Sequence, residues 1–307
     1  MNIIITGGAG FVGSHLVELL VKKKHYPIII DNLNSGLYSN IKHFVDSKKA
    51  KFIKCDIRNF KKVLQLPKVD AVIHLAAIAS VVESIDNPTL VNDVNVNGTL
   101  NMLEFCRKKK IKKFVFTSSA AIYGDYEKKI TEKTPTIPTT VYGSTKLTGE
   151  QYCKIYSNLF GINITSLRPF NIYGPRQNDT YAGVISKFMD RLNENKNPII
   201  FGNGRQTRDF IHVDDVVRAF YYALKFKKTK FAVFNLATGK STSINELAKI
   251  FLLATKKSNL KPIYKKPISG VVIHNSTNPT KIKQHLGFIS TINLTNGITN
   301  FVNPHTS

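Results

Sequence analysis

The sequence predicts an α/β protein: a parallel sheet wound on both faces by helices, followed by a smaller α/β lobe. Two observations carry this prediction. Strand and helix patterns alternate from residue 2 to residue 168, which is typical of a doubly wound parallel sheet. Beyond Arg168 prolines and glycines break the alternation. We therefore expect a first domain over residues 1–167 and a second, smaller lobe over 168–307, with about 205–236 returning to the first domain.

Each element follows from its residue pattern. Short apolar runs rich in β-branched residues predict strands, and apolar residues repeating every three or four positions predict helices. The strands are expected at Asn2–Thr6, Pro27–Asp31, Lys51–Cys55, Ala71–Leu75, Lys113–Thr117 and Ile162–Arg168. The helices are expected at Ser14–Lys23, about Asn59–Leu66, Asn92–Lys109 and Tyr142–Phe160.

The first strand leads into a glycine-rich loop, Thr6-Gly-Gly-Ala-Gly-Phe-Val-Gly13, and then into a helix. Glycine lets the backbone approach a pyrophosphate, and the helix offers free N–H groups and its positive dipole end. The loop alone is a weak signal, but this context predicts a dinucleotide site. Asp31 ends the second strand, where it can bind the adenosine ribose. Its charge would repel a 2′-phosphate, so NAD is expected rather than NADP.

The composition predicts a globular chain with a basic surface. Of the 307 residues 42% are hydrophobic, and the formal net charge is +24. Lysines cluster at Lys22–Lys24 and Arg107–Lys113, where cations suit helix ends, so we favour a solvated surface over a nucleic-acid or membrane partner. The three cysteines are far apart, so we expect a reducing cytoplasm and neither a metal site nor a disulfide framework. No apolar run could span a bilayer, and no signal peptide is expected.

Two further segments carry reactive side chains. Tyr142 and Lys146 lie four residues apart, on one face of a helix. A nearby lysine and a positively charged nicotinamide both favour the phenolate, so Tyr142 is a candidate base. The strand Lys113–Thr117 delivers Thr117, Ser118 and Ser119 at its carboxyl end, where a hydroxyl can bond a substrate oxygen beside the tyrosine. A surface helix pair and a serine that caps the backbone are the plain alternatives, but their occurrence with the glycine loop favours a site.

At this point the chain resembles the extended short-chain dehydrogenase/reductases, in particular the NAD-dependent epimerase/dehydratase family. The resemblance runs from Met1 to about Gly287 and is strongest to UDP-glucose 4-epimerases and their UDP-N-acetylglucosamine relatives. It implies a Rossmann-type sheet. Besides the segments above, it rests on Cys55-Asp-Ile57, His74-Leu-Ala-Ala77, Asn95-Val-Asn-Gly-Thr99, Ser118-Ser-Ala-Ala-Ile-Tyr-Gly124, Arg168-Pro-Phe-Asn-Ile-Tyr-Gly-Pro-Arg176 and Arg208-Asp-Phe-Ile-His-Val-Asp-Asp215.

The resemblance implies a role for each matching residue. Ser119, Tyr142 and Lys146 would form the catalytic set. The sugar nucleotide would be held by Ser119, Asn171, Arg208 and Asn275, with Arg208 on the diphosphate; an ion pair with Asp209 or Asp214 is the alternative for this arginine. NAD would contact Gly7, Gly10, Phe11, Val12, Asp31, Asn32, Asp56, Ile57, Leu75, Ala76, Ala77, Asn95, Tyr142 and Lys146. Two copies would pair as a homodimer through helices 92–109 and 142–160.

The implied reaction is 4-epimerisation of UDP-glucose and UDP-galactose or of their N-acetyl forms. Tyr142 would take the proton of the sugar 4-hydroxyl while the C4 hydride passes to NAD. The 4-keto sugar would turn over and receive the hydride on its other face. Ser119 would steady the oxygen, and Lys146 would orient the ribose and lower the pKa of Tyr142.

The chain departs from the family pattern in two places. Ala120 and Ala121 follow Ser119, where dehydratases carry an acid pair and decarboxylases usually a glutamate. Ile268 and Val271 replace the charged pair of an Arg-x-Gly-Asp pattern, so a second diphosphate-binding arginine is missing. Lysine at 265 or 266 could compensate, although it lacks the bidentate fork.

Two alternative functions stay open. One is another nucleotide-sugar oxidoreductase or a decarboxylase of the same family, which would differ from an epimerase by net accumulation of NADH. The other is a non-catalytic member that binds NAD and RNA through the basic surface. Salt-dependent retention on RNA that survives Tyr142→Phe would favour it.

Overall fold

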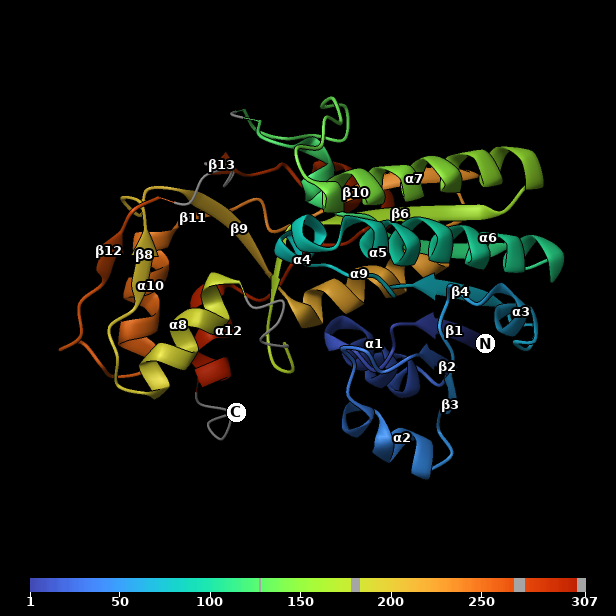
Figure 1. The fold of residues 1–307 in the computed structure, drawn as a ribbon, viewed down its shortest axis with the longest axis horizontal. Coiled ribbons are helices and arrows are strands. Elements are labelled where there is room, and N and C mark those ends of the chain that lie inside the picture. Colours follow the sequence, from blue (N-terminus) through green and yellow to red (C-terminus); the bar gives the residue numbers. More distant parts are fainter. Residues whose placement is uncertain (127, 178–182, 268–273, 303–307) are drawn as a thin grey trace.

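The computed structural model describes residues 1–126, 128–177, 183–267 and 274–302. A seven-stranded parallel sheet forms its larger part, in the order β10-β6-β5-β4-β1-β2-β3 (Figure 1). The direction of winding reverses between β1 and β4, so a crevice opens at the carboxyl ends of these strands. The strands are β1 (Asn2–Thr6), β2 (Tyr26–Asp31), β3 (Lys51–Lys54), β4 (Ala71–His74), β5 (Lys113–Thr117), β6 (Asn163–Pro169) and β10 (Phe231–Leu236).

Helices cover both faces because the strands are buried on both sides. Strand residues such as Ile3 and Ile5 pack against α1, α9 and α11, whereas Ile4 and Val72 pack toward α3, α6 and α7. One layer holds α1 (Phe11–Lys22), α2 (Lys42–Asp46), α9 (Val213–Lys225) and α11 (Thr280–Leu286), and the other holds α3 (Phe60–Leu64), α6 (Gly98–Lys108) and α7 (Val141–Phe160). Shorter turns are η1 (Tyr38–Asn40), α4 (Val81–Asp86), α5 (Pro88–Asn92), η2 (Asp93–Asn97) and η3 (Ala120–Tyr123).

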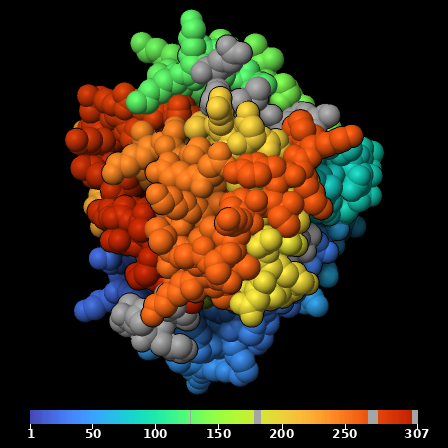
Figure 2. Space-filling view, turned by 90° about the vertical axis from the view of Figure 1, so that its left-hand side faces the viewer, coloured from blue at the N-terminus to red at the C-terminus, as the bar shows by residue number. Residues whose placement is uncertain are grey.

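The second lobe is built around β9, which pairs with three strands from distant parts of the chain. A separate core with Phe188, Leu247 and Phe251 joins its helices. Figure 2 shows this lobe end-on, with the orange and yellow segments at its centre. Its elements are β7 (Asn171–Tyr173), α8 (Val184–Asn193), β8 (Ile199–Phe201), β9 (Thr207–His212), β11 (Ser241–Ser243), α10 (Ile244–Ala254), β12 (Ile263–Lys265), β13 (His274–Asn275) and α12 (Leu294–Val302).

The doubly wound sheet is confirmed, and the six expected strands agree with the observed ones to within a residue or two. Of the segment 205–236, α9 and β10 pack with the large sheet, whereas β9 stays in the second lobe. The single helix expected at Asn92–Lys109 is in fact α5, a wide π turn (η2) and α6. Lys22–Lys24 and Arg107–Lys110 close α1 and α6, as expected. Lys113, the last residue of the second cluster, is instead buried in β5, where its ammonium donates to Thr165 (2.9 Å). No helix among the described residues is long and apolar enough to cross a bilayer.

Candidate active site

The glycine loop has the geometry of a phosphate cradle. Gly7 adopts the left-handed conformation (φ +70°), and a Cβ there would lie 2.8 Å from the backbone nitrogen of Ala76. At Gly10 a Cβ would meet only the Gly7 carbonyl within 4 Å, so a side chain would stand in the crevice that Gly10 lines. Helix α1 begins at the next residue and directs its N-terminus toward this space. The loop therefore leaves room for an anion against backbone N–H groups.

A cleft of about 260 Å³ extends from this loop along the carboxyl ends of β1, β2 and β4. Asp31 is buried at its edge, where its carboxylate accepts the N–H of Ala9 (3.0 Å) and of Leu33 (2.8 Å). Burial raises the pKa of Asp31, and these bonds oppose the rise. The cleft is lined by most of the residues expected to touch NAD: Gly7, Gly10, Phe11, Val12, Asp31, Asn32, Asp56, Ile57, Leu75, Ala76 and Ala77.

Asp56 is held by Arg58, which belongs to no motif of the sequence. Arg58 donates from Nε to Oδ1 (3.0 Å) and from Nη2 to Oδ2 (2.7 Å), and Asn32 donates to Oδ2 (3.1 Å). The bond from Arg58 lowers the pKa of Asp56 to about 2. Arg58 lines the same cleft, so the ion pair of Asp56 and Arg58 forms part of the cleft wall.

Asn95 lies behind the cleft and does not line it. Its amide accepts the N–H of Ile78 (2.8 Å) and donates to the carbonyl of the same residue (3.0 Å) and to Thr145 (3.0 Å). Ile78 does line the cleft. In this structure Asn95 therefore shapes the cleft wall and ties it to α7, and a direct contact with NAD stays a prediction.

Beneath the loop, a buried histidine completes a chain of hydrogen bonds. The Thr6 hydroxyl accepts the N–H groups of the two residues after His74, so its own proton goes to Nδ1 of His74 (2.7 Å). Nε2 then carries the ring proton toward Thr99 (3.0 Å), whose hydroxyl donates to the Asn95 carbonyl (2.6 Å). Burial, with the charge of Lys146, lowers the pKa of His74 to about 3. The network thus requires a neutral ring.

This histidine predicts a loss of stability in mild acid. An unfolded histidine has a pKa of about 6.5, so below that pH the unfolded chain binds a proton at this residue. In the folded protein, His74 binds the proton only near pH 3. The free energy of unfolding should fall by about 2 kcal/mol between pH 7 and pH 5 from this group. Chemical denaturation at both pH values measures it. His74→Gln should flatten the dependence and His43→Gln, at an exposed site, should not; equal slopes in all three proteins would contradict the assignment.

Ser119 and Tyr142 both line a second cavity, of about 870 Å³, between the sheet and the second lobe. Ser119 precedes η3 and accepts the N–H of Ala121 (3.1 Å), while Tyr142 stands in the first turn of α7. Burial raises the pKa of Tyr142, and a hydrogen bond with Ser119 opposes the rise. The serine and the phenol expected to act together are therefore neighbours.

Lys146 follows Tyr142 by one helical turn in α7. Its ammonium is buried and donates to the Thr117 carbonyl (2.8 Å), above the ring of Phe116. Burial lowers the pKa of Lys146 to about 8. Burial dominates at the phenol here, so the lowering of the Tyr142 pKa by Lys146 and a bound nicotinamide stays a prediction.

A buried ion pair fixes the elements that carry these groups. Arg168 of β6 binds Glu150 of α7 through two bonds, one of them from Nε (3.1 Å), and donates to the Tyr123 hydroxyl (2.6 Å) at the end of η3. Tyr123 in turn donates to Asn235 of β10 (2.7 Å). This pair positions η3 and α7, and hence Ser119 and Tyr142, against one strand.

The expected substrate residues come from the second lobe. Asn171 and Arg208 line the second cavity, and Asn275 pairs in register with Arg208 across β13 and β9. The ion pair considered for Arg208 does not form: Asp209 accepts from Thr238 and Gly239, Asp214 faces two histidines, and Arg208 donates to the Thr207 carbonyl (2.8 Å). Ile268 and Val271 lie outside the described residues.

Other lining residues carried a weaker signal in the sequence. Arg205, after the Gly202-Asn-Gly204 turn, adds a second guanidinium to the cavity. Phe11, Val12, Ala79 and Gln177 line both the cleft and the cavity, so the two spaces meet there. Within the part of the chain that the structure describes, no group of three or more side chains could hold a metal ion.

Comparison with known proteins agrees with this geometry. Residues 3–237 match the model of the NAD dependent epimerase/dehydratase family. A putative UDP-glucose 4-epimerase of Methanocaldococcus jannaschii is 42% identical over 98% of this chain and 97% of its own length. A UDP-glucose 4-epimerase of Thermotoga maritima, solved with UDP-glucose, superposes with a TM-score of 0.93 at 36% identity, covering 98% of this chain and 97% of that one.

A UDP-glucuronic acid 4-epimerase of Bacillus cereus, solved with UDP-glucuronic acid and NAD, is similar in structure as well. Its TM-score is 0.91 at 31% identity, and 99% of each chain is covered. The matched region includes the glycine loop, α7 and the second lobe. The chain therefore belongs to the NAD dependent epimerase/dehydratase family.

Proposed function

We propose that this protein is a nucleotide-sugar 4-epimerase that uses NAD and acts on UDP-glucose and UDP-galactose or on their N-acetyl forms. The observation that carries the proposal is the meeting of the two spaces. Ser119 and Tyr142 stand in the wall of the larger cavity, and Phe11, Val12 and Gln177 join that cavity to the cofactor cleft. The likeness to 4-epimerases solved with UDP-sugars supports it.

The residues of the cleft fit NAD. Gly7 and Gly10 leave the pyrophosphate a place where side chains are excluded, and the buried carboxylate of Asp31 suits a ribose diol. When bound, NAD supplies a reversible hydride acceptor. Asn95 would support the cleft wall from behind. Lys146 could contact the ribose only if its ammonium left the Thr117 carbonyl.

Proton transfer falls to the phenol of Tyr142. As the phenolate, its oxygen would take the proton of the sugar 4-hydroxyl while the C4 hydride passes to bound NAD. It would return that proton once the 4-keto sugar has turned over and the hydride has come back to C4. Ser119 donates to the same sugar oxygen. A cationic lysine and an oxidised nicotinamide close to the phenol would offset the effect of burial on its pKa.

The nucleotide is held in the second lobe. Arg208 and Arg205 both line the cavity and offer guanidinium groups to the diphosphate, which they can bind bidentately. Asn171 donates to the Asp209 carbonyl (2.9 Å), which ties β7 to β9 beside Arg208. The resemblance assigns Asn275 to the region of the sugar C2 group, and β13 pairs this residue in register with Arg208.

The proposal is tested by incubating the purified protein with UDP-glucose, UDP-galactose and both N-acetyl forms, followed by separation of the products. We expect interconversion at C4 without net accumulation of reduced nicotinamide. Stoichiometric NADH, or loss of water or carbon dioxide from the sugar, would point to another reaction of the family. A carboxylate for such an elimination is not offered by η3, which begins with Ala120 and Ala121.

We further propose a homodimer whose interface includes α7. Ile155 and Leu159 of α7 expose 48% and 70% of their surface, and α4, which packs against α7, exposes Val82 and Ile85. Exposed apolar side chains in the last turns of α7, and on α4 beside the start of the same helix, favour a second copy as their cover. The exposed apolar residues lie on α4 and α7, whereas the resemblance named α6 as the partner of α7.

Leu159→Glu should convert the dimer into a monomer, because the carboxylate would be buried without a partner in the interface. Sedimentation velocity at micromolar concentration measures the state. The control is Leu253→Glu, at a leucine of α10 that is exposed to a similar degree. Dimers in both variants would exclude this interface.

We also propose a cytoplasmic location. Cys55, Cys106 and Cys153 are buried and free, as in proteins kept in a reducing compartment. Fractionation of cells that express the tagged protein would test it.

A further inference from the structure

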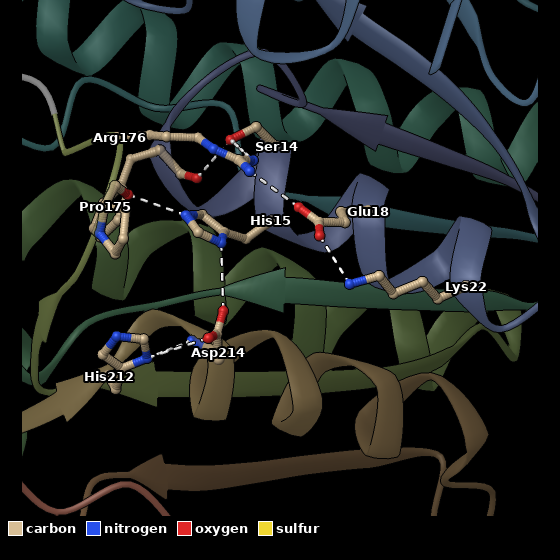
Figure 3. A network of polar contacts seen from close by, with 9 residues as sticks. Ser14, His15, Glu18, Lys22, Pro175, Arg176, His212 and Asp214 are labelled. Carbon is tan, nitrogen blue, oxygen red and sulfur yellow. Dashed lines mark hydrogen bonds and ion pairs between the residues drawn. The ribbon is translucent and has the colours of Figure 1, made fainter. Parts of the chain in front are cut away.

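Outside the two cavities, one polar cluster joins the cofactor half to the second lobe. Figure 3 shows His15 and Glu18 of α1 facing the segment after β7 and the start of α9. The contacts come from three separated stretches of chain: α1, residues 174–176 and residues 212–214. None of these side chains has been given a task by the proposed reaction.

Arg176 holds the first of these contacts. Its Nη2 pairs with Glu18 (3.0 Å) and its Nη1 donates to Ser14 (3.3 Å). The residue adopts the left-handed conformation (φ +65°), which costs a non-glycine residue free energy. The strained backbone at Arg176 is retained together with the guanidinium contacts. We infer that these contacts fix the path of the chain at this residue.

His15 holds the second contact, and it is 9% exposed. Its Nε2 donates to the Pro175 carbonyl (3.0 Å), and its Nδ1 faces the Asp214 carboxylate (3.4 Å). Asp214 also faces His212 (3.6 Å), whose Nδ1 accepts the Asp214 backbone N–H (3.2 Å) and caps α9. Residues 175 and 176 are therefore attached to α1 at two points.

The attached segment ends at the junction of the two spaces. Gln177 follows Arg176 directly and lines both the cofactor cleft and the substrate cavity. Phe11 and Val12, in the first turn of α1, line both as well, less than two turns before Glu18. The contacts of His15 and Arg176 thus fasten a segment across the helix end where the pyrophosphate is expected.

We propose that Arg176 and His15 are positioning residues that clamp residues 174–177 onto α1 and so slow the release of bound dinucleotide. The inference rests on the proposed function, which gives it a purpose. A 4-epimerase returns the hydride to the sugar that gave it. If the reduced cofactor dissociates during a turnover, the 4-keto sugar can no longer be reduced to product. A clamp at the junction lengthens the residence of the cofactor without touching the reacting atoms.

The test is the rate of cofactor release. Purified protein is loaded with NADH and diluted into excess NAD, and the loss of bound-NADH fluorescence is followed. Arg176→Asn keeps a residue that tolerates the left-handed conformation and removes the guanidinium. We expect release to be about 10-fold faster. Glu18→Gln, which leaves residue 176 unchanged, should show the same direction, and the exchanged pair Arg176→Glu with Glu18→Arg should recover most of the loss.

Lys22→Gln is the matched control, because Lys22 is the other partner of Glu18 (2.9 Å) and lies away from the junction. It should release the cofactor at the wild-type rate. Release within twofold of wild type in both Arg176→Asn and Glu18→Gln would overturn the clamp, as would equal acceleration by Lys22→Gln. A wild-type protein that retains no dinucleotide at all would instead overturn the proposed function.

Discussion

Tyr142→Phe is expected to lower kcat for epimerisation by about 10²–10⁴-fold, the usual contribution of a positioned acid or base. The phenol lines the substrate cavity beside Ser119, and the described residues that line this cavity include no carboxylate, histidine or lysine that could take the 4-hydroxyl proton instead. The ring itself stays, so the packing of α7 and the cofactor cleft should be unchanged. Product formation from UDP-galactose, followed at saturating substrate, measures the effect.

The control for this variant is cofactor content. The 260 nm to 280 nm absorbance ratio after gel filtration should match that of wild type. A matched hydroxyl deletion at Tyr156→Phe, on the same helix but bonded to Glu104 (2.7 Å), should leave kcat within a few-fold. Most of the activity surviving in Tyr142→Phe would show that the base is another group.

Gly13→Ala should lower the free energy of unfolding by about 3 kcal/mol and abolish NAD binding. Inside a helix, alanine is ordinarily favoured over glycine by about 1 kcal/mol, so propensity alone predicts the opposite sign. A Cβ at residue 13, however, would lie 2.1 Å from the Gly7 carbonyl oxygen and 2.6 Å from the Gly8 Cα. Only a shift of the loop backbone relieves such an overlap, and that shift removes the cradle.

Gly10→Ala, in the same loop, separates the two effects. Its Cβ would lie 3.3 Å from the Gly7 carbonyl, so the fold should lose no more than about 1 kcal/mol, as for an N-cap change. Binding of NAD should still weaken, since the methyl group enters the cleft. Denaturant unfolding and NAD titration measure both. A Gly13→Ala protein as stable as wild type would contradict the tight approach of α1 to the loop.

Features written in short stretches of sequence were predictable. The apolar runs of β1 and β2, the glycine loop and the acid after β2 each depend on neighbouring residues, so periodicity and turn chemistry were enough. The choice of Ser119 among Thr117, Ser118 and Ser119 needed the resemblance, since which of these hydroxyls lies beside Tyr142 is settled only in the folded sheet.

Features set by distant contacts were not predictable from local patterns. The π turn at Asp93–Asn97 accompanies the side chain of Asn95, which bonds the backbone of Ile78 in another segment. Likewise β9 takes partners from residues 171–173, 241–243 and 274–275. The residues near Lys146 in the sequence do not indicate that its ammonium will bond the Thr117 carbonyl, because this bond depends on how α7 packs against β5.

The position of β10 limits how the chain could be divided. This strand comes from the second half of the sequence yet forms the border of the large sheet, hydrogen-bonded to β6 along its length. A fragment cut after residue 170 would present β6 as a bare border of unpaired peptide groups and would uncover the apolar side that α9 shields. Such a fragment should self-associate. A chimera that combines this large sheet with the second lobe of a relative should therefore take residues 213–236 from the same protein as the sheet.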